Sequence, residues 1–523
     1  MSPRHYLIAG IAFAAFALLV ATMRRVPTPL PDAQFYASIA RTTELRGIGI
    51  PSVLRHSPIA VDHTDFYGPV FFTAVASAFD WFGVSLRSLR AVSLLGALLV
   101  VLAGALLAHA VSGRRWRWVW AAALLLLTPE IQRNATAGTM ETLAVGLEML
   151  AVAVFVCGLR ADRWRAWYAA AAGLLLTLGA LTTPRTYPFV AAFFAAGLFF
   201  PGMTPDERRQ AWRQMGATFG TFAIGIGTWA IVSHGSVLAW MRYMAFILTH
   251  EDSDIAMLPT ARRQWLFSIG AAVTPLASAL SAIAVAALCS RARRAHERVG
   301  LAGFALLTGW AAFVGGTVAM NLTFQKTTYI ALPLFMAVLA MPYEDLDVHP
   351  RALAGAVSTL LAVELGLAVV WYARVAATWE ARNPDPVYAF FEQHVPPGSA
   401  VIGTYGPYYI AVERAGSRYR SISSRSWADW ARWVPLIEPE AVAEAMNVPI
   451  TITRERFFIW RPDDALPPPY GCVRGHEVAT FQPAPTHLGV LGWLGSRTWD
   501  TGYPPIVLYR LPDGCPTGYD PTR

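Results

Sequence analysis

Residues 65–85, DFYGPVFFTAVASAFDWFGVS, determine on which side of a membrane the later segments of this chain lie. The apolar run 69–84 is short, follows Gly68-Pro69, contains Asp80 and has aromatic residues near both ends. A transmembrane helix needs roughly 20 mostly apolar residues. We therefore predict that residues 69–84 form an interfacial or re-entrant segment that does not cross the bilayer.

A membrane is expected because of the composition of the whole chain. Of its 523 residues, 55% are hydrophobic and only 15% are charged, and the mean hydropathy is +0.41. This composition predicts an α-helical polytopic membrane protein. Twelve apolar stretches carry the signal, at 6–23, 69–84, 89–111, 118–131, 139–159, 167–183, 187–200, 215–233, 265–289, 300–320, 328–341 and 351–373. The first is interpreted as a retained span, because no small-residue cleavage site follows it.

The loop arginines predict the topology. With 69–84 placed in an external loop at 24–88, 11 spans remain, and the clusters GRRWRW, RADRWR, DERRQAWR and RARRAHER all lie on the side of the N-terminus. That side carries 15 Lys or Arg against six in the opposite short loops, so the positive-inside rule makes it cytoplasmic. The sequence pI of 9.4 therefore reflects topology, and no nucleic-acid partner is expected.

Ionisable residues collect at the external ends of the predicted spans. They are Asp32, His63, Asp65, Arg133, Glu141, Arg185 and Lys326, the last being the only lysine of the chain. Ionisable groups within a bilayer cost several kcal/mol and normally face a cavity or a partner. Several of the supporting spans are shorter than the roughly 17 residues usually needed, so we expect their outer ends to line a cavity.

The acidic residues each fit two interpretations. Asp32, in PLPDAQFYASIART, either caps the helix that follows or accepts a proton from an attacking hydroxyl as a general base. Glu141, in ATAGTMETLAV, is either a first-turn acid favoured by the helix dipole or a second catalytic carboxylate. His63 and Asp65 are either turn residues or part of a substrate site, and two such ligands do not make a metal site.

The basic residues also fit two interpretations. Lys326, Arg185 and Arg133 either extend toward lipid headgroups or bind an anion in the predicted cavity. Three cations among carboxylates and apolar helices favour an anionic ligand with an apolar body, and a lipid phosphate meets both conditions. Lysine supplies a compact point charge where arginine supplies a planar fork. Position 326 is therefore predicted to have room for an ammonium but not for a guanidinium.

Five segments resemble, in this order, the motifs of one enzyme family. They are PDAQFYASIART at 31–42, HTDFYGPVFF at 63–72, LTPEIQRNATAGTMETLAV at 127–145, GALTTPRTYPFV at 179–190 and FQKTTYIALPLFMAVLA at 324–340. Over nearly its whole length the chain resembles the polyprenyl-phosphate-dependent glycosyltransferases of the GT-C superfamily, in the branch of the protein O-mannosyltransferases and the enzymes that transfer aminoarabinose to lipid A. The chain departs from the family at Gly68-Pro69, which replaces a proline pair, at Glu141, usually Asp, and at Arg185, usually lysine.

The resemblance implies a reaction and a set of roles. A sugar on a polyprenyl phosphate would be transferred outside the membrane, by one inverting displacement, to a hydroxyl of a lipid, glycan or protein. The catalytic carboxylates would be Asp32 and Glu141. The donor phosphate would be bound by Lys326, Arg185, Arg133 and Tyr329, and the substrate by His63, Asp65 and Tyr67. Some relatives use a divalent metal, but no Asp-x-Asp pair lies near Asp32, so we predict no metal and no other cofactor.

The chain changes in character after residue 373. Residues 1–373 are predicted to form the transmembrane domain, and residues 374–523 a small external α/β domain. Its strand-like runs are SAVIGTYG, PITITRERFFIW and PPIVLYRLP, and its helix-like stretches lie at 385–394 and 426–446. Because disulfides persist outside the cytoplasm, a Cys472–Cys515 bridge is a hypothesis for this domain. The protein would be multi-pass in a bacterial inner membrane, among membrane lipids, with this domain in the periplasm.

Two other classes of protein fit parts of the sequence. A transporter or lipid flippase would show interrupted helices in two corresponding halves, and we find no two-fold hydropathy pattern. A binding or assembly protein whose external domain does the work would not need 11 spans as an anchor. An enzyme with a site on one side of the membrane accounts for more of the residues than either alternative.

Overall fold

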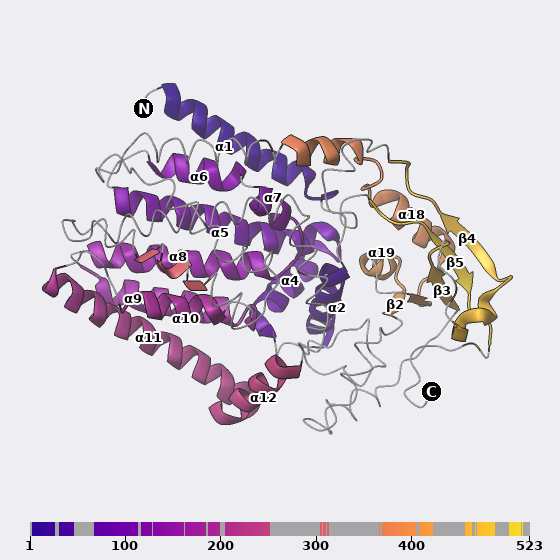
Figure 1. The fold of residues 1–523 in the computed structure, drawn as a ribbon. Helices are drawn as coiled ribbons and strands as arrows, with labels where there is room; N and C mark the ends of the chain where they lie inside the picture. Colours follow the sequence, from indigo (N-terminus) through magenta and orange to yellow (C-terminus); the bar gives the residue numbers. More distant parts are fainter. Residues whose placement is uncertain are drawn as a thin grey trace.

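The computed structural model of the chain is mostly helical, with a small β-sheet near the C-terminus (Figure 1). The residues described are 3–26, 31–46, 67–112, 117–127, 129–161, 163–184, 187–198, 204–250, 304–305, 307–309, 311–312, 366, 369–403, 407–421, 455–462, 466, 468–486, 502–513 and 515.

Helices that lie side by side make up most of this structure. Among the described residues, four helices are long and apolar enough to cross a membrane, namely α1 (Pro3–Thr22), α5 (Leu86–Ser112), α8 (Glu141–Arg160) and α11 (Pro205–His234). Shorter helices accompany them: α6 (Arg117–Leu127), α7 (Pro129–Ala135), α9 (Arg165–Ala180), α10 (Tyr187–Ala196) and α12 (Val237–His250). Large apolar side chains are exposed on the outer helices, such as Phe13 at 72% and Val232 at 75%. Such a surface is typical of helices that face lipid, and the predicted fold class is confirmed.

Glycines allow the helices of this layer to pack closely. A Cβ atom on Gly146 of α8 would lie 2.4 Å from the carbonyl oxygen of Gly96 in α5. A Cβ atom on Gly173 of α9 would lie 2.5 Å from the carbonyl oxygen of Thr218 in α11. Backbones approach closely where the side chains are small, which is how membrane helices gain packing energy. The order α5, α8, α9, α11 across the layer follows from these contacts (Figure 1).

The segment 69–84 does not cross the helical layer. It forms α4 (Pro69–Phe82), a helix of 14 residues. The segment between α1 and α5 begins and ends at the same end of the helical layer. Nη1 of Arg90, near the start of α5, donates a hydrogen bond to the carbonyl oxygen of Met23, just after α1 (2.7 Å). Helix α2 (Pro31–Arg46) and α4 therefore both lie at one end of the layer, as juxtamembrane helices predicted for the first loop (Figure 1).

Arginines at the end of α8 and at the start of α11 lie at the opposite end of the layer. A side-chain nitrogen of Arg160, at the end of α8, donates to the carbonyl oxygen of Ala110, at the end of α5. Gln214, in the first half of α11, donates to the carbonyl oxygen of Phe155 in the last part of α8 (2.8 Å). Residues 113–116 of the first cluster and the whole cluster at 291–298 lie outside the described residues, as do several of the 11 predicted spans, so the number of spans stays a prediction.

The C-terminal part contains a five-stranded mixed sheet with the order β2-β1-β3-β5-β4. The strands are β1 (Ala400–Gly403), β2 (Arg418–Ser421), β3 (Arg456–Trp460), β4 (Glu477–Phe481) and β5 (Ile506–Arg510). Strand β1 pairs in parallel with β2 and β3, and β5 pairs antiparallel with β3 and β4. Helix α19 (Tyr409–Arg414) connects β1 to β2, and α18 (Asp385–His394) precedes β1. We call this part, residues 378–515 as described, the sheet domain.

A disulfide joins Cys472, in the 3-10 helix η6 (Pro468–Val473), to Cys515 beyond β5. Their Cα atoms are 6.1 Å apart. This is the pair that the sequence analysis proposed. The predicted domain boundary at 373/374 falls within a helical segment, 369–377, so that the chain passes into the sheet domain without a flexible linker.

Candidate active site

Four segments meet around the start of α2, and we call this place the α2 junction. They are the first turn of α2, the turn at 67–70 before α4, the loop at 136–140 before α8 and the turn at 181–184 after α9. A Cβ atom on Gly138, where φ is +75°, would lie 3.6 Å from the Cβ atom of Ala33. The loop that leads into α8 therefore lies against the residue that follows Asp32.

The turn at 67–70 is held against the end of α9. Gly68 has φ +91°, and a Cβ atom at this position would lie 2.0 Å from the carbonyl oxygen of Leu181. The same carbonyl accepts a hydrogen bond from the backbone nitrogen of Val70 (3.2 Å). The Gly-Pro sequence at 68–69 thus brings the end of the first loop directly against the turn that precedes Arg185.

Aromatic side chains pack beneath the α2 junction. The ring of Tyr36 lies 5.8 Å from that of Tyr67 and 6.2 Å from those of Phe71 and Phe72, measured between ring centroids. These four rings are buried, and Tyr67 is 8% exposed. Edge-to-face aromatic contacts of this kind stabilise a core by about 0.5–1.5 kcal/mol per pair. In this structure Tyr67 contributes to packing, and its role in substrate binding stays a prediction.

The structure locates some of the predicted site residues and not others. Asp32 lies in the first turn of α2 and Arg133 in α7, with side chains outside the described part of the chain. Glu141 is the first residue of α8 and is half-buried. Outside the described residues lie His63, Asp65, Arg185, Lys326 and Tyr329.

The backbones of Asp32, Arg133 and Glu141 are brought to the same end of the helical layer. The hydroxyl of Thr142 donates to the carbonyl oxygen of Asn134 (3.0 Å), which ties the start of α8 to the end of α7. The hydroxyl of Ser93 in α5 donates to the carbonyl oxygen of Thr139 (2.8 Å) and holds the connecting loop. The positive end of the α8 dipole favours the carboxylate of Glu141 in either of its interpretations.

The α2 junction brings the backbones that carry Asp32, Arg133 and Glu141, from three separate helices, to one end of the helical layer. Among the described residues, no group of three or more His, Cys, Asp or Glu side chains has the arrangement of a metal site. The expectation of a reaction without a metal stays a prediction.

Sequence reasoning missed two buried charged residues near this end. Arg90, in α5, is 1% exposed and donates a hydrogen bond to the carbonyl oxygen of Met23. Glu148, in α8, is 0% exposed, and its Cγ atom lies 2.9 Å from the place that a Cβ atom on Gly179 of α9 would take. A charged residue inside an apolar stretch is the signal that identifies both, because such residues are rare in membrane helices. Glu148 lies seven residues after Glu141, on the same face of α8.

Sequence reasoning also missed the tyrosines where the sheet domain contacts the helical layer. Burial raises the pKa of Tyr408 and of Tyr503 well above the usual value of 10. The hydroxyl of Tyr408 donates to the carbonyl oxygen of Pro504, which keeps the two segments together. Both tyrosines are therefore neutral at physiological pH.

Comparison with solved structures places this arrangement in a known fold. The structure of ArnT from Cupriavidus metallidurans in the apo state is similar over 96% of this chain and 97% of that chain, with a TM-score of 0.54 and 13% identity. ArnT from the same organism bound to undecaprenyl phosphate matches with the same coverage and identity and a TM-score of 0.52. The oligosaccharyltransferase AglB from Archaeoglobus fulgidus, in complex with an inhibitory peptide and a dolichol-phosphate, covers 88% of this chain and 70% of its own, with 15% identity and a TM-score of only 0.44.

No protein-family model matches the chain, and no curated protein matches its sequence. At 13% identity the likeness to ArnT shows the fold alone. The two chains match over almost their full lengths, helical layer and sheet domain together. The chain has the fold of ArnT.

Proposed function

We propose that this protein is an integral membrane glycosyltransferase that transfers a sugar from a polyprenyl-phosphate donor to an acceptor hydroxyl. The observation that carries the proposal is the fold shared with ArnT over 96% of the chain, since one of the ArnT structures is bound to undecaprenyl phosphate. The described candidates Asp32, Arg133 and Glu141 have their backbones at one end of the helical layer. This arrangement supports a site on one side of the membrane, as transfer requires, rather than a pathway across it.

The proposed reaction is a single displacement at the anomeric carbon. Asp32 accepts the proton of the acceptor hydroxyl as the oxygen attacks. A bond forms between that oxygen and the anomeric carbon while the bond from the carbon to the phosphate oxygen breaks, and the electron pair leaves with the polyprenyl phosphate. Attack opposite to the leaving group inverts the anomeric configuration. Glu141, at the start of α8, is the second carboxylate of the proposal.

The departing phosphate gains negative charge during this step. Arg133, Arg185 and Lys326 are proposed to neutralise it, with Tyr329 as a hydroxyl donor. Such preorganised donors typically contribute 10²–10³ in rate each. His63, Asp65 and Tyr67 are proposed to bind the substrate because the segment HTDFYGPVFF resembles the family motif that leads into a juxtamembrane helix. The nature of the acceptor, whether lipid, glycan or protein, is left to experiment.

The arginine distribution supports a cytoplasmic N-terminus, an external α2 junction and an external sheet domain. In a bacterium the protein would lie in the inner membrane with the sheet domain in the periplasm. The disulfide between Cys472 and Cys515 is compatible with an oxidising compartment.

Incubation of the detergent-purified protein with a panel of labelled polyprenyl-phosphate sugars and a membrane extract tests the proposal. We expect one donor to be consumed and its label to appear in an acceptor of the extract. An enzyme turns over without sealed compartments, whereas a flippase needs two of them. If no donor is consumed in detergent but vesicles containing the protein move lipid-linked sugars between leaflets, the transferase is ruled out and the flippase is supported.

A further inference from the structure

The sheet domain contacts α2 directly, through α19. The backbone nitrogen of Ile410, in the first turn of α19, donates a hydrogen bond to Oε1 of Gln34 (3.0 Å). The two residues are 376 positions apart in the sequence, and each is 1% exposed. Figure 1 shows α19 lying between α2 and the sheet. One buried polar contact therefore joins the sheet domain to the helix that carries Asp32.

This hydrogen bond satisfies a group that would otherwise have no acceptor. The first four backbone N–H groups of a helix have no partner within that helix, and Ile410 is the second residue of α19. A buried N–H group without a partner is costly. Gln34 therefore acts as a cap for α19, and the position of α2 along its axis is fixed relative to the strands β1 and β2 that α19 connects.

The opposite side of α2 is packed against α4. Tyr36 contacts the rings of Phe71 and Phe72, and Ile39 and Ala40, on the same side of α2 as Tyr36, are 0% exposed. Apolar packing of this kind holds α2 near α4, but it does not specify one position along the helix axis as a single hydrogen bond does. Gln34 and Asp32 belong to the same first turn of α2. A shift of that turn moves both residues together.

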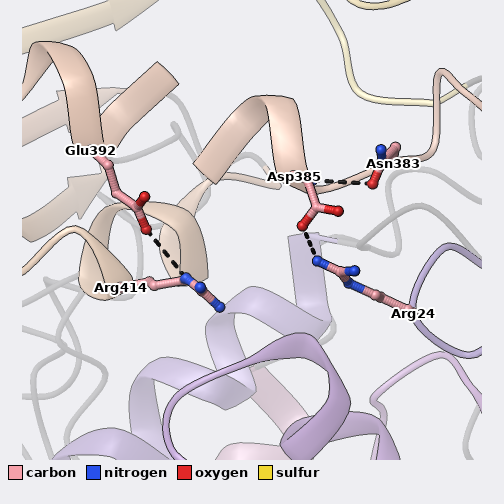
Figure 2. A network of polar contacts seen from close by, with 5 residues as sticks. All are labelled: Arg24, Asn383, Asp385, Glu392 and Arg414. Carbon is pink, nitrogen blue, oxygen red and sulfur yellow. Dashed lines mark hydrogen bonds and ion pairs between the residues drawn. The ribbon is translucent and has the colours of Figure 1, made fainter. Parts of the chain in front are cut away.

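Ion pairs attach the sheet domain to the segment just before α2. Arg24 pairs with Asp385, whose backbone nitrogen donates to Oδ1 of Asn383 (3.2 Å), as Figure 2 shows. Nη1 of Arg25 lies 3.1 Å from a carboxylate oxygen of Glu380. A second pair in Figure 2, Arg414 with Glu392 (3.3 Å), lies entirely within the sheet domain. The chain is thus held by the sheet domain both before α2 and within its first turn.

We propose that Gln34 is a positioning residue through which the sheet domain holds α2, and with it Asp32, in the geometry needed for transfer. The inference rests on the proposed function of Asp32 as general base. Its chemical basis is the sensitivity of such reactions to geometry, because a displacement of about 1 Å can reduce the rate about 100-fold. The sheet domain then sets the rate of the reaction without contributing a reacting group.

The first test measures the position of α2 and requires no activity. Backbone hydrogen exchange is followed in the full-length protein for wild type, Gln34→Met, Gln34→Glu and Arg414→Ala. Methionine has a similar size but only a weakly accepting sulfur, glutamate keeps an acceptor oxygen, and Arg414→Ala removes a polar contact inside the sheet domain. We expect exchange at residues 35–42 to rise about fivefold or more in Gln34→Met only. Unchanged hydrogen exchange in α5 and α8 shows that the variant is folded. If Gln34→Met exchanges at α2 as slowly as wild type, the inference is overturned.

The second test measures transfer with the donor identified above. In Gln34→Met we expect kcat to fall about tenfold or more while the donor KM stays within about twofold, and Gln34→Glu to recover most of the rate. An equal loss in Arg414→Ala, or no recovery in Gln34→Glu, overturns the positioning role. If wild type transfers no sugar from any donor while exchange at α2 still responds to Gln34→Met, the proposed function fails and the attachment of α2 to the sheet domain stands.

Discussion

Gly68 is the position of the α2 junction where both the backbone and the neighbouring chain require a glycine. Its φ of +91° and ψ of 156° lie in a region that is accessible almost only to glycine. A Cβ atom would also collide with the carbonyl group of Leu181. We therefore expect Gly68→Ala to lower the free energy of unfolding by more than about 4 kcal/mol, beyond the roughly 1–3 kcal/mol of backbone strain alone.

Gly83, at the other end of α4, provides the matched control for this prediction. Its φ of +77° and ψ of 161° are close to those of Gly68, but a Cβ atom there would meet no atom within 4 Å. Thermal unfolding in detergent should therefore show a smaller loss for Gly83→Ala than for Gly68→Ala. Equal losses would mean that the contact with Leu181 does not constrain the turn.

Buried tyrosines of the sheet domain predict a pH dependence of stability. Because burial raises the pKa of Tyr408 and Tyr503 well above 10, the unfolded chain loses these protons near pH 10 while the folded chain keeps them. The free energy of unfolding therefore keeps its full contribution from these two tyrosines below pH 10. Above pH 10 it decreases by about 1.4 kcal/mol for each pH unit and for each of the two tyrosines. Urea unfolding followed between pH 8 and about 11.5 should show this decrease and a shallower slope in Tyr408→Phe. A stability that is independent of pH above 10 would contradict the prediction.

Single residues were predictable from the sequence only where their neighbours in the chain explain them. Asp32 and Glu141 stand at the starts of helices, where an acid is visible against an apolar background. Gln34 has no such signal, because its partner Ile410 is 376 positions away. Arg90 is visible in the sequence as a charged residue inside an apolar run. Its hydrogen-bond acceptor, the carbonyl oxygen of Met23, is not visible there, because the contact depends on how α1 and α5 pack.

Among the elements, the disulfide of the sheet domain has a measurable effect. It connects η6 to the segment after β5 across a sequence separation of 43 residues, and closing a loop of that length contributes about 4 kcal/mol. Cys472→Ser should therefore destabilise the sheet domain by roughly this amount, measured by limited proteolysis at increasing urea. Cys157→Ser, which changes the free cysteine of α8, is the control and should leave the sheet domain unaffected. The same sensitivity to protease in both variants would contradict the expectation.

Elements of the sheet domain were predictable when their residues are mostly buried. Strands β1, β3 and β5 fall within the predicted apolar runs, and α18 has the predicted bounds, 385–394. Strand β4 has mostly exposed residues and only Phe481 buried, so it lacks an apolar run. Strand β2 and the six-residue α19 are too short to show a periodicity. The helix-like stretch at 426–446 lies outside the described residues.

For the whole molecule, the mostly helical fold was predictable because the apolar composition is read directly from the sequence, whereas the membrane topology stays a prediction. The arginine count requires that residues 69–84 do not cross the membrane, and α4 indeed stays at the end of the layer where α1 ends and α5 begins. Docking of the sheet domain on α2 was not predictable, since it depends on surfaces from distant parts of the chain. The fold could therefore be anticipated at low detail, and the contacts that position the site could not.

Labelling of single cysteines tests the orientation. In a chain with Cys157→Ser and Cys289→Ser, a cysteine replaces Glu477 of the sheet domain or Arg163 between α8 and α9, both exposed. Glu477→Cys should react with a membrane-impermeant maleimide in intact cells. Arg163→Cys should react only after the membrane is permeabilised. The opposite pattern would invert the topology and place the α2 junction in the cytoplasm.

The transfer rate of Asp32→Asn shows whether Asp32 is the general base of the proposed reaction. With the purified protein and its donor, we expect kcat to fall about 10²–10⁴-fold, because the amide cannot accept the proton of the attacking hydroxyl. Asp80→Asn, which changes an exposed acid of α4 at the same end of the layer, should keep the wild-type rate. A folded Asp32→Asn variant that transfers sugar as fast as wild type would contradict the proposed mechanism and leave Asp32 as a first-turn acid favoured by the dipole of α2.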